Sequence, residues 1–306
     1  MRILISVFFV IIINGLVNAQ SVKLSSKRNK DNSVSINYEK DSYGSFYVVT
    51  KFNKLTNSLD SKIAKVVNGR RGRLGCLKPM DSNKCIDYSY TYRSMRGKPN
   101  AKIDTDFTYI LPFKKNTEVY VKSLAYLGTQ FNEKEPENWT AYQFFTKGEK
   151  MVVAARKGLV VKVIDEFKTD TTHRYRFKRS KNEVLIEHSD GSLASYKGLK
   201  GGSISVEEGQ IVNPNDEIGL SDRYDKKGKY EIRYCLYYLD KEGINDIYSQ
   251  KKHTNLYAYI KPLFFTKKGK SFLEIRKIFV ADCSEELIMQ EFSRREKKKY
   301  LKAKLN

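Results

Sequence analysis

The residues that could do chemistry are few and widely spaced. The chain has three histidines, which share no short motif: His173, His188 and His253. Neither a Gly-x-Ser-x-Gly elbow nor a Walker-type phosphate loop occurs in the sequence, so neither serine-hydrolase nor nucleotide chemistry has a sequence signal. The most suggestive group is Glu231-Ile232-Arg233. The two-residue period of a strand places Glu231, Arg233 and Cys235 on one face, where a carboxylate beside a guanidinium favours an ion pair over a metal site.

Short β-type segments, separated by glycine turns, must position these residues. Such punctuation is typical of a compact β-barrel or sandwich. The segments that carry the pattern are 152–160, 182–191, 194–199, 206–212, 216–221 and 230–236.

The residues of these segments, in this order, resemble the sequence motifs of a known family. They read Val-Val-Ala-Ala-Arg-Lys-Gly-Leu-Val at 152–160, Asn-Glu-Val-Leu-Ile-Glu-His-Ser-Asp-Gly at 182–191 and Tyr-Lys-Gly-Leu at 196–199. An Ile-Gly-Leu-Ser turn at 218–221 and Glu-Ile-Arg at 231–233 follow. The region 145–240 is similar to lysostaphin-type (LytM-like) zinc metallopeptidases, many of which cut peptide cross-links in peptidoglycan. The resemblance implies the duplicated hybrid motif, an antiparallel β barrel-sandwich.

The residues that such a peptidase uses for zinc are missing. Gly198 stands where the family has a catalytic His, and Arg233 stands at the third ligand position. The stretch 139–145, which corresponds to the first two ligands, contains neither His nor Asp. His188 matches a position that is structural in the family. We therefore expect a degenerate, metal-free and non-catalytic member, with Tyr196, His188, Glu231 and Arg233 as candidates for lining the old substrate groove.

Three functions stay open on the sequence. The first is a non-catalytic protein that binds a cell-wall component or an envelope protein, or that regulates a cell-wall hydrolase. The second is an active zinc endopeptidase with relocated ligands. The third is a basic structural or adhesive surface protein, because the net charge is +22 and a field of this size attracts polyanions. For an exported chain, anionic wall polymers and lipid headgroups fit that charge better than nucleic acid does.

The N-terminus predicts export. Arg2 precedes an apolar run at 3–13, and Val17-Asn18-Ala19 offers small residues for cleavage, as in a signal peptide over 1–19. The apolar run is shorter than the ~20 residues of a membrane span, and we expect no transmembrane segment in the mature chain. The periplasm or the surface of a bacterium is the expected location.

The rest of the chain divides by composition. We expect a disordered leader at 20–32, an N-terminal β-sandwich-like domain at 33–127, a linker at 128–145, the peptidase-like domain at 146–266 and a C-terminal extension at 267–306. Asp282 or Ser284 is suited to cap a helix in this extension. The helix ends in a basic run, from Arg294 to Lys304, which reads as a tether to an anionic surface or as a solvated end.

The cysteine pattern suggests a disulfide. Cys76 and Cys85 bracket a short, turn-rich loop, and an exported chain favours pairing across it. Cys235 and Cys283 are far apart in sequence, and their pairing stays open.

Overall fold

Alternating apolar residues build the N-terminal domain as two facing three-stranded sheets. The computed structural model describes residues 21–60, 62–99, 101–126, 135–136, 138–168, 181–224, 229–241, 244 and 255–304. One sheet has the order β1-β2-β5 and the other β4-β3-β6, and between them lie Val22, Ile36, Phe46, Val48, Val67 and Leu74. The strands are β1 (Lys23–Arg28), β2 (Val34–Glu39), β3 (Phe46–Thr56), β4 (Lys62–Val67), β5 (Arg71–Leu77) and β6 (Asp87–Arg96).

The predicted disordered leader is instead part of this sandwich. Strand β1 pairs along its whole length with β2, from Lys23 opposite Glu39 to Arg28 opposite Val34. Val22, immediately before it, is fully buried. The sequence obscures this strand because it lies at a sheet edge, where the polar and basic side chains of an edge strand face water. The predicted signal peptide lies outside the described residues.

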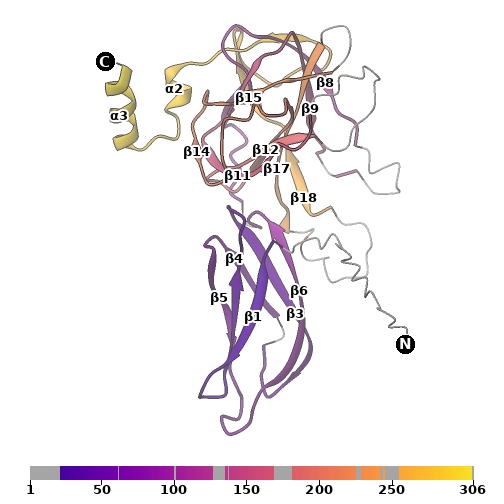
Figure 1. The fold of residues 1–306 in the computed structure, drawn as a ribbon, viewed down its shortest axis with the longest axis vertical. Coiled ribbons are helices and arrows are strands. Elements are labelled where there is room, and N and C mark those ends of the chain that lie inside the picture. The colour runs from indigo at the N-terminus through magenta and orange to yellow at the C-terminus, as the bar shows by residue number, and fades with distance from the viewer. Residues whose placement is uncertain are drawn as a thin grey trace, which may run out of the picture.

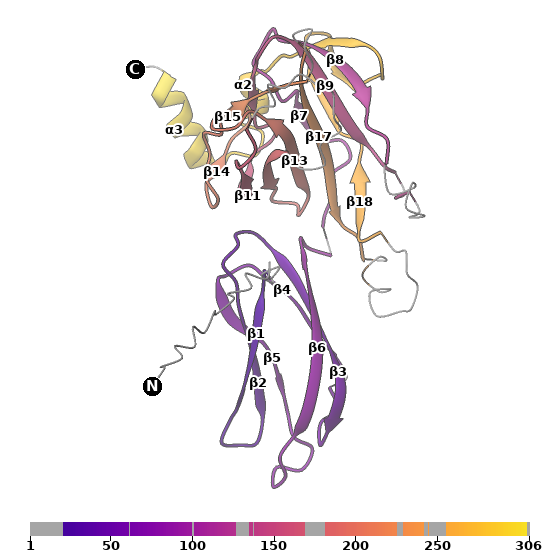
Figure 2. The ribbon, with the colours of Figure 1, turned by 45° about the vertical axis from the view of Figure 1, so that its right-hand side comes forward.

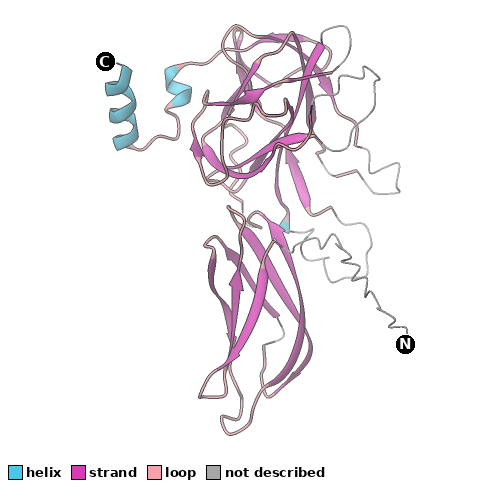
Figure 3. Cartoon of the chain, viewed as in Figure 1, coloured by secondary structure: helices cyan, strands magenta, loops and turns pink. Residues whose placement is uncertain are grey.

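The second domain is organised around one large antiparallel sheet. Its main path runs β14-β11-β12-β13-β17-β9-β8-β21, and β16 and β18 add to β17. In Figure 1 this domain forms the upper half of an elongated molecule, and strands predominate in both halves (Figure 3). The prediction of an all-β chain is confirmed. The bounds are β7 (Thr108–Ile110), β8 (Glu118–Ser123), β9 (Ala141–Lys147), β10 (Met151–Val153), β11 (Gly158–Ile164), β12 (Asn182–Glu187), β13 (Leu193–Leu199), β14 (Ile211–Val212), β15 (Glu217–Leu220), β16 (Asp222–Arg223), β17 (Lys229–Leu239), β18 (Tyr257–Ile260), β19 (Leu263–Thr266), β20 (Gly269–Ser271) and β21 (Ile278–Val280).

The domain boundary differs from the predicted one. Strands β7 and β8 were expected in the N-terminal domain but belong to the second, where β8 pairs with β9. The predicted linker 128–145 overlaps β9, a central strand whose Phe144 is fully buried. Strand β9 was missed because it is buried on both faces for part of its length, so its pattern does not alternate cleanly.

The two domains meet at a buried carboxylate. Glu187 accepts hydrogen bonds from the backbone N–H of Ser45, at 2.7 Å, and from its hydroxyl, at 2.5 Å. Lys98 lies 3.5 Å from the same carboxylate. Gly44 has a φ of +79°, and a Cβ there would lie 2.5 Å from a methyl of Val161. A glycine is therefore required for this close approach, and the junction is specific.

The C-terminal extension contains more than the predicted basic helix. Residues 269–280 supply β20 and β21, and the helical part is divided into α2 (Glu285–Ile288) and α3 (Arg294–Lys304). Ser284 caps α2 by accepting a hydrogen bond from the N–H of Leu287, as Ser at this position predicts. Figures 1 and 2 both show the two helices on the side of the second domain where β14 lies, and α2 contacts β7. Among the described residues, no helix is long and apolar enough to span a membrane.

The predicted Cys76–Cys85 disulfide is wrong. All four cysteines are free thiols. The sulfur of Cys76 lies 3.7 Å from the carbonyl oxygen of Leu77, whereas that of Cys85 lies 3.5 Å from the side-chain oxygen of Asn32. Each sulfur thus has a different neighbour, and Cys76 lies within β5 whereas Cys85 lies beyond the turn and is exposed.

Candidate functional site

One face of the large sheet carries polar side chains at its centre, among them the matched positions Glu231 and Arg233. The opposite face is core, with Phe144, Ile232 and Tyr234 among its buried residues. Because side chains alternate along a strand, the neighbours of these residues point to the other face. Register then aligns one row as Tyr120, Phe145 and Glu231 and a second row as Lys122, Gln143, Arg233 and Lys197. We call this surface the groove face.

The carboxylate of Glu231 lies between two cations at the centre of the groove face. Glu231 is 1% exposed. Its oxygens accept hydrogen bonds from the ammonium of Lys181 and the amide of Gln143, and the guanidinium of Arg233 lies 3.3 Å away. Burial lowers the pKa of Lys181, and the charge of Glu231 opposes that shift. The cluster is thus a largely buried ion triad with one amide.

Gly198 leaves the space that the lysine uses. Its φ is +91°, and a Cβ added there would lie 3.2 Å from the carbonyl oxygen of Glu231 and 3.7 Å from the Cδ of Lys181. A left-handed backbone favours glycine, and a larger side chain would compete with the stem of the lysine. Where the resembled family has a catalytic imidazole, this chain therefore has the stem of Lys181.

The matched positions do not fit zinc. Zinc needs neutral imidazole, thiolate or carboxylate donors with an open coordination position. Here the one carboxylate, Glu231, is already bound by donors, and the adjacent ammonium and guanidinium would repel a divalent cation. In the part of the chain that the structure describes, no three His, Cys, Asp or Glu side chains are grouped closely enough to hold a metal.

Tyr196 and His188 do not line the groove face. Tyr196 is fully buried in the core, where its hydroxyl accepts a hydrogen bond from the N–H of Ala155 at 2.8 Å. His188 is 1% exposed, and its Nδ1 lies 2.8 Å from the carbonyl oxygen of Lys157. Burial lowers the pKa of His188 to about 4, with a contribution from the charge of Arg156. Both are structural residues. His173 and His253 lie outside the described residues.

A second charged cluster, centred on Arg156, was missed by sequence reasoning. Arg156 is 3% exposed and stacks 3.7 Å above the ring of Phe107. It binds Asp190 at 2.6 Å and Glu291 through two bonds of 3.0 and 2.8 Å. Lys157 and Glu296 form a further pair at 2.6 Å. These contacts anchor the helical tail to the second domain, and no local signal links residues 135 positions apart.

Lys181 and Gln143 were also missed. Gln143 could have been found from strand register alone, because it lies opposite Arg233 and beside Phe145, the partner of Glu231. Lys181 lies just before β12, next to a register shift between Asn182 and Glu183, and no sequence pattern signals its contact with Glu231.

Comparisons with known proteins place the chain among distant structural likenesses. No protein-family model matches the sequence, and a search of curated proteins finds no match. The M23 metalloprotease pseudoalterin from the deep sea is 14% identical, with 58% of this chain and 97% of that chain covered and a TM-score of 0.32. A zinc-containing peptidase from Vibrio cholerae is 16% identical over 71% and 75% of the two chains, with a TM-score of 0.25. A chain of the SpoIIQ–SpoIIIAH pore-forming complex is 19% identical over 44% and 84%, with a TM-score of 0.27.

Two of these matched structures are named as peptidases, one of them as an M23 enzyme. At these TM-scores the likenesses carry no argument about activity. The chemistry of the groove face therefore depends on the side chains that this chain places there.

Proposed function

We propose that this chain is an exported, non-catalytic protein with a peptidase-like β domain, whose groove face binds a peptide–glycan component of the cell wall. One observation carries the proposal: the ammonium of Lys181 and the guanidinium of Arg233 contact the buried carboxylate of Glu231, and Glu231 and Arg233 stand at the His-x-His positions of the resembled family. Regulation of a true wall hydrolase through the same face is the alternative form of this function.

The groove face supports binding without hydrolysis. Peptide hydrolysis by this family requires an activated, metal-bound water and a donor for the developing oxyanion. Glu231 is neutralised by its neighbours and Gly198 has no side chain to donate. The exposed cations of the face, including Lys197 with 46% of its side chain exposed, are suited to carboxylates and amide oxygens of a wall peptide.

The tail provides a second contact of different chemistry. Helix α3 has no buried residues and carries Arg294, Arg295, Lys297, Lys298, Lys299, Lys302 and Lys304. Because Arg156 and Lys157 anchor the tail, these charges are presented on a fixed element. We propose that α3 holds the protein to an anionic envelope surface.

The test combines metal analysis, hydrolysis and binding on the purified mature protein. We expect far less than one zinc per chain and no release of new peptide termini from purified peptidoglycan, with or without added zinc. An active lysostaphin-type peptidase is the positive control. Near-stoichiometric zinc together with cleavage that a chelator abolishes would establish the active-peptidase alternative.

Binding is measured by sedimentation with insoluble peptidoglycan at low and high salt. Lys197→Ala on the groove face should weaken binding several-fold, and Lys62→Ala, on an exposed position of β4, should not. Binding that survives high salt and depends on Lys197 supports the groove. Equal effects of the two substitutions, with binding lost at high salt, would instead favour a protein that adheres by charge alone.

A further inference from the structure

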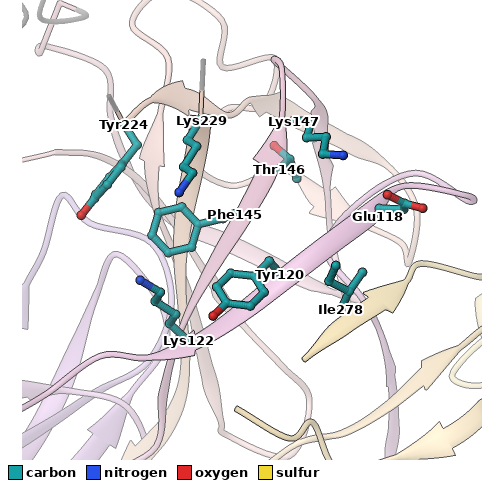
Figure 4. Close-up of a pocket in the computed structure, with 9 residues that line it drawn as sticks. All are labelled: Glu118, Tyr120, Lys122, Phe145, Thr146, Lys147, Tyr224, Lys229 and Ile278. Atoms are coloured by element: carbon teal, nitrogen blue, oxygen red, sulfur yellow. The ribbon is translucent and has the colours of Figure 1, made fainter. Parts of the chain in front are cut away.

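A pocket opens on the groove face at the edge where β8, β9, β17 and β21 meet (Figure 4). It encloses about 250 Å³. Its lining combines aromatic and aliphatic side chains with charged ones: Glu118, Tyr120, Lys122, Phe145, Thr146, Lys147, Tyr224, Lys229 and Ile278. Neither the sequence motifs nor the comparisons point to it.

The floor of the pocket is a row of apolar side chains that the strand register aligns. Ile278 lies opposite Tyr120, and Tyr120 lies opposite Phe145, so three neighbouring strands place these side chains on the same face. The rings of Phe145 and Tyr224 meet edge to face at 4.9 Å. Phe145 is 7% exposed, but Ile278 is 62% exposed. Contiguous exposed apolar surface, rather than single scattered side chains, marks binding sites, and here the exposed Ile278 adjoins the aromatic rings of the pocket.

The rim of the pocket is positive. Lys122, Lys147 and Lys229 border it against one acid, Glu118. The ammonium of Lys122 lies 5.4 Å from the centre of the Phe145 ring and 5.9 Å from that of Tyr120. Figure 4 shows Lys122 and Lys229 on two sides of the Phe145 ring. The occupant must therefore be apolar at its centre and anionic at its periphery.

The size and charge narrow the occupant to a peptide side chain. Pockets for drug-sized ligands usually exceed ~300 Å³, whereas about 250 Å³ suits a single large side chain. An anionic polymer would gain no binding energy from the apolar floor. A second copy of this chain, with a net charge of +22, would be repelled.

We propose that this pocket binds one aromatic or large aliphatic side chain of a partner protein, flanked by acidic residues that pair with Lys122 and Lys147. Such an anchored side chain within a polar rim is the usual form of an interface hot spot. The proposal does not depend on the Glu231 cluster binding any ligand, nor on the absence of hydrolysis.

The test uses two fluorescein-labelled peptides and anisotropy titration of the full chain. One peptide is Asp-Glu-Trp-Glu-Asp and the other replaces its Trp by Ser. We expect the Trp peptide to bind about tenfold or more tightly than the Ser peptide, because only the first fills the apolar floor. Equal binding of both peptides, or no binding of the Trp peptide at millimolar protein, overturns the proposal.

Two variants locate the site. Ile278→Ser should weaken binding of the Trp peptide about fivefold or more, while Ile211→Ser, on β14 with 63% of the residue exposed, serves as the matched control. Lys122→Ala should weaken both peptides and flatten the salt dependence, unlike Lys62→Ala. Thermal melts establish whether each variant is folded. If Ile278→Ser does not fold, Lys122→Ala tests whether the pocket is the binding site. Equal affinities for a variant and its control refute the assignment.

Discussion

Replacing Glu231 by Gln tests the ion triad at the centre of the groove face most directly. The carboxylate is 1% exposed and stands between Lys181 and Arg233, whose side chains are 19% and 13% exposed. Removing its charge leaves two cations facing each other with little access to water. Breaking a buried pair in this way costs about 3–5 kcal/mol, and we expect Glu231→Gln to lose that much unfolding free energy at pH 7.

The loss should shrink as the pH rises. Burial already lowers the pKa of Lys181 from its ordinary 10.5, and Glu231 partly opposes that shift, so in Glu231→Gln the pKa falls further. Between the lowered pKa and 10.5 the unfolded chain binds more protons than the folded chain, and stability therefore rises with pH in that window. For each further unit by which the pKa of Lys181 is lowered in the variant, the variant's unfolding free energy rises by ~1.4 kcal/mol more than the wild type's between neutral and alkaline pH.

The assay is urea unfolding of wild type and variant at pH 7 and at pH 9.5. Glu183→Gln is the matched control on the same face, because this buried carboxylate pairs at 3.6 and 3.4 Å with Lys162 and Lys197, which are 43% and 46% exposed. Water can solvate those lysines, and the control should cost ~1 kcal/mol or less. A double variant, Glu231→Gln with Lys181→Met, should recover most of the loss. The reasoning is refuted if Glu231→Gln costs no more than Glu183→Gln at pH 7, or if its cost does not change with pH.

The tail and the thiols give two further expected outcomes. Glu291→Gln removes the anion that binds Arg156 through two hydrogen bonds, so trypsin should cut within 294–304 faster than in wild type, while the β domains melt within a few degrees of wild type; an unchanged cleavage rate would show that the tail is held elsewhere. In native protein at pH 8, iodoacetamide should modify the exposed Cys85 first and Cys235 last, because burial raises the pKa of the Cys235 thiol to about 12. Mass spectrometry of the digested protein measures the order of modification. Early labelling of Cys235 would contradict its placement.

Residue types and the two-residue alternation of strands predicted the fold class, and the sequence sets which side chains stand at the matched positions. Glycine turns and two-residue alternation predicted an all-β chain, and the structure confirms it. The identities Gly198 and Arg233 are set by the sequence alone, because no folding can supply an imidazole at either position. Ser284 likewise predicted a capped helix from local chemistry alone, and it is the residue that caps α2.

Only the tertiary structure decided which charges meet. Lys181 and Glu231 are 50 residues apart, and Arg156 and Glu291 are 135 apart, so no local period relates them. The polar strand β1 resembles a disordered segment until β2 is present to pair with it. Register likewise brings Ile278, Tyr120 and Phe145 into one row. This last row depends on strand pairing between distant segments, and a one-residue shift would abolish it by turning the side chains to the other face.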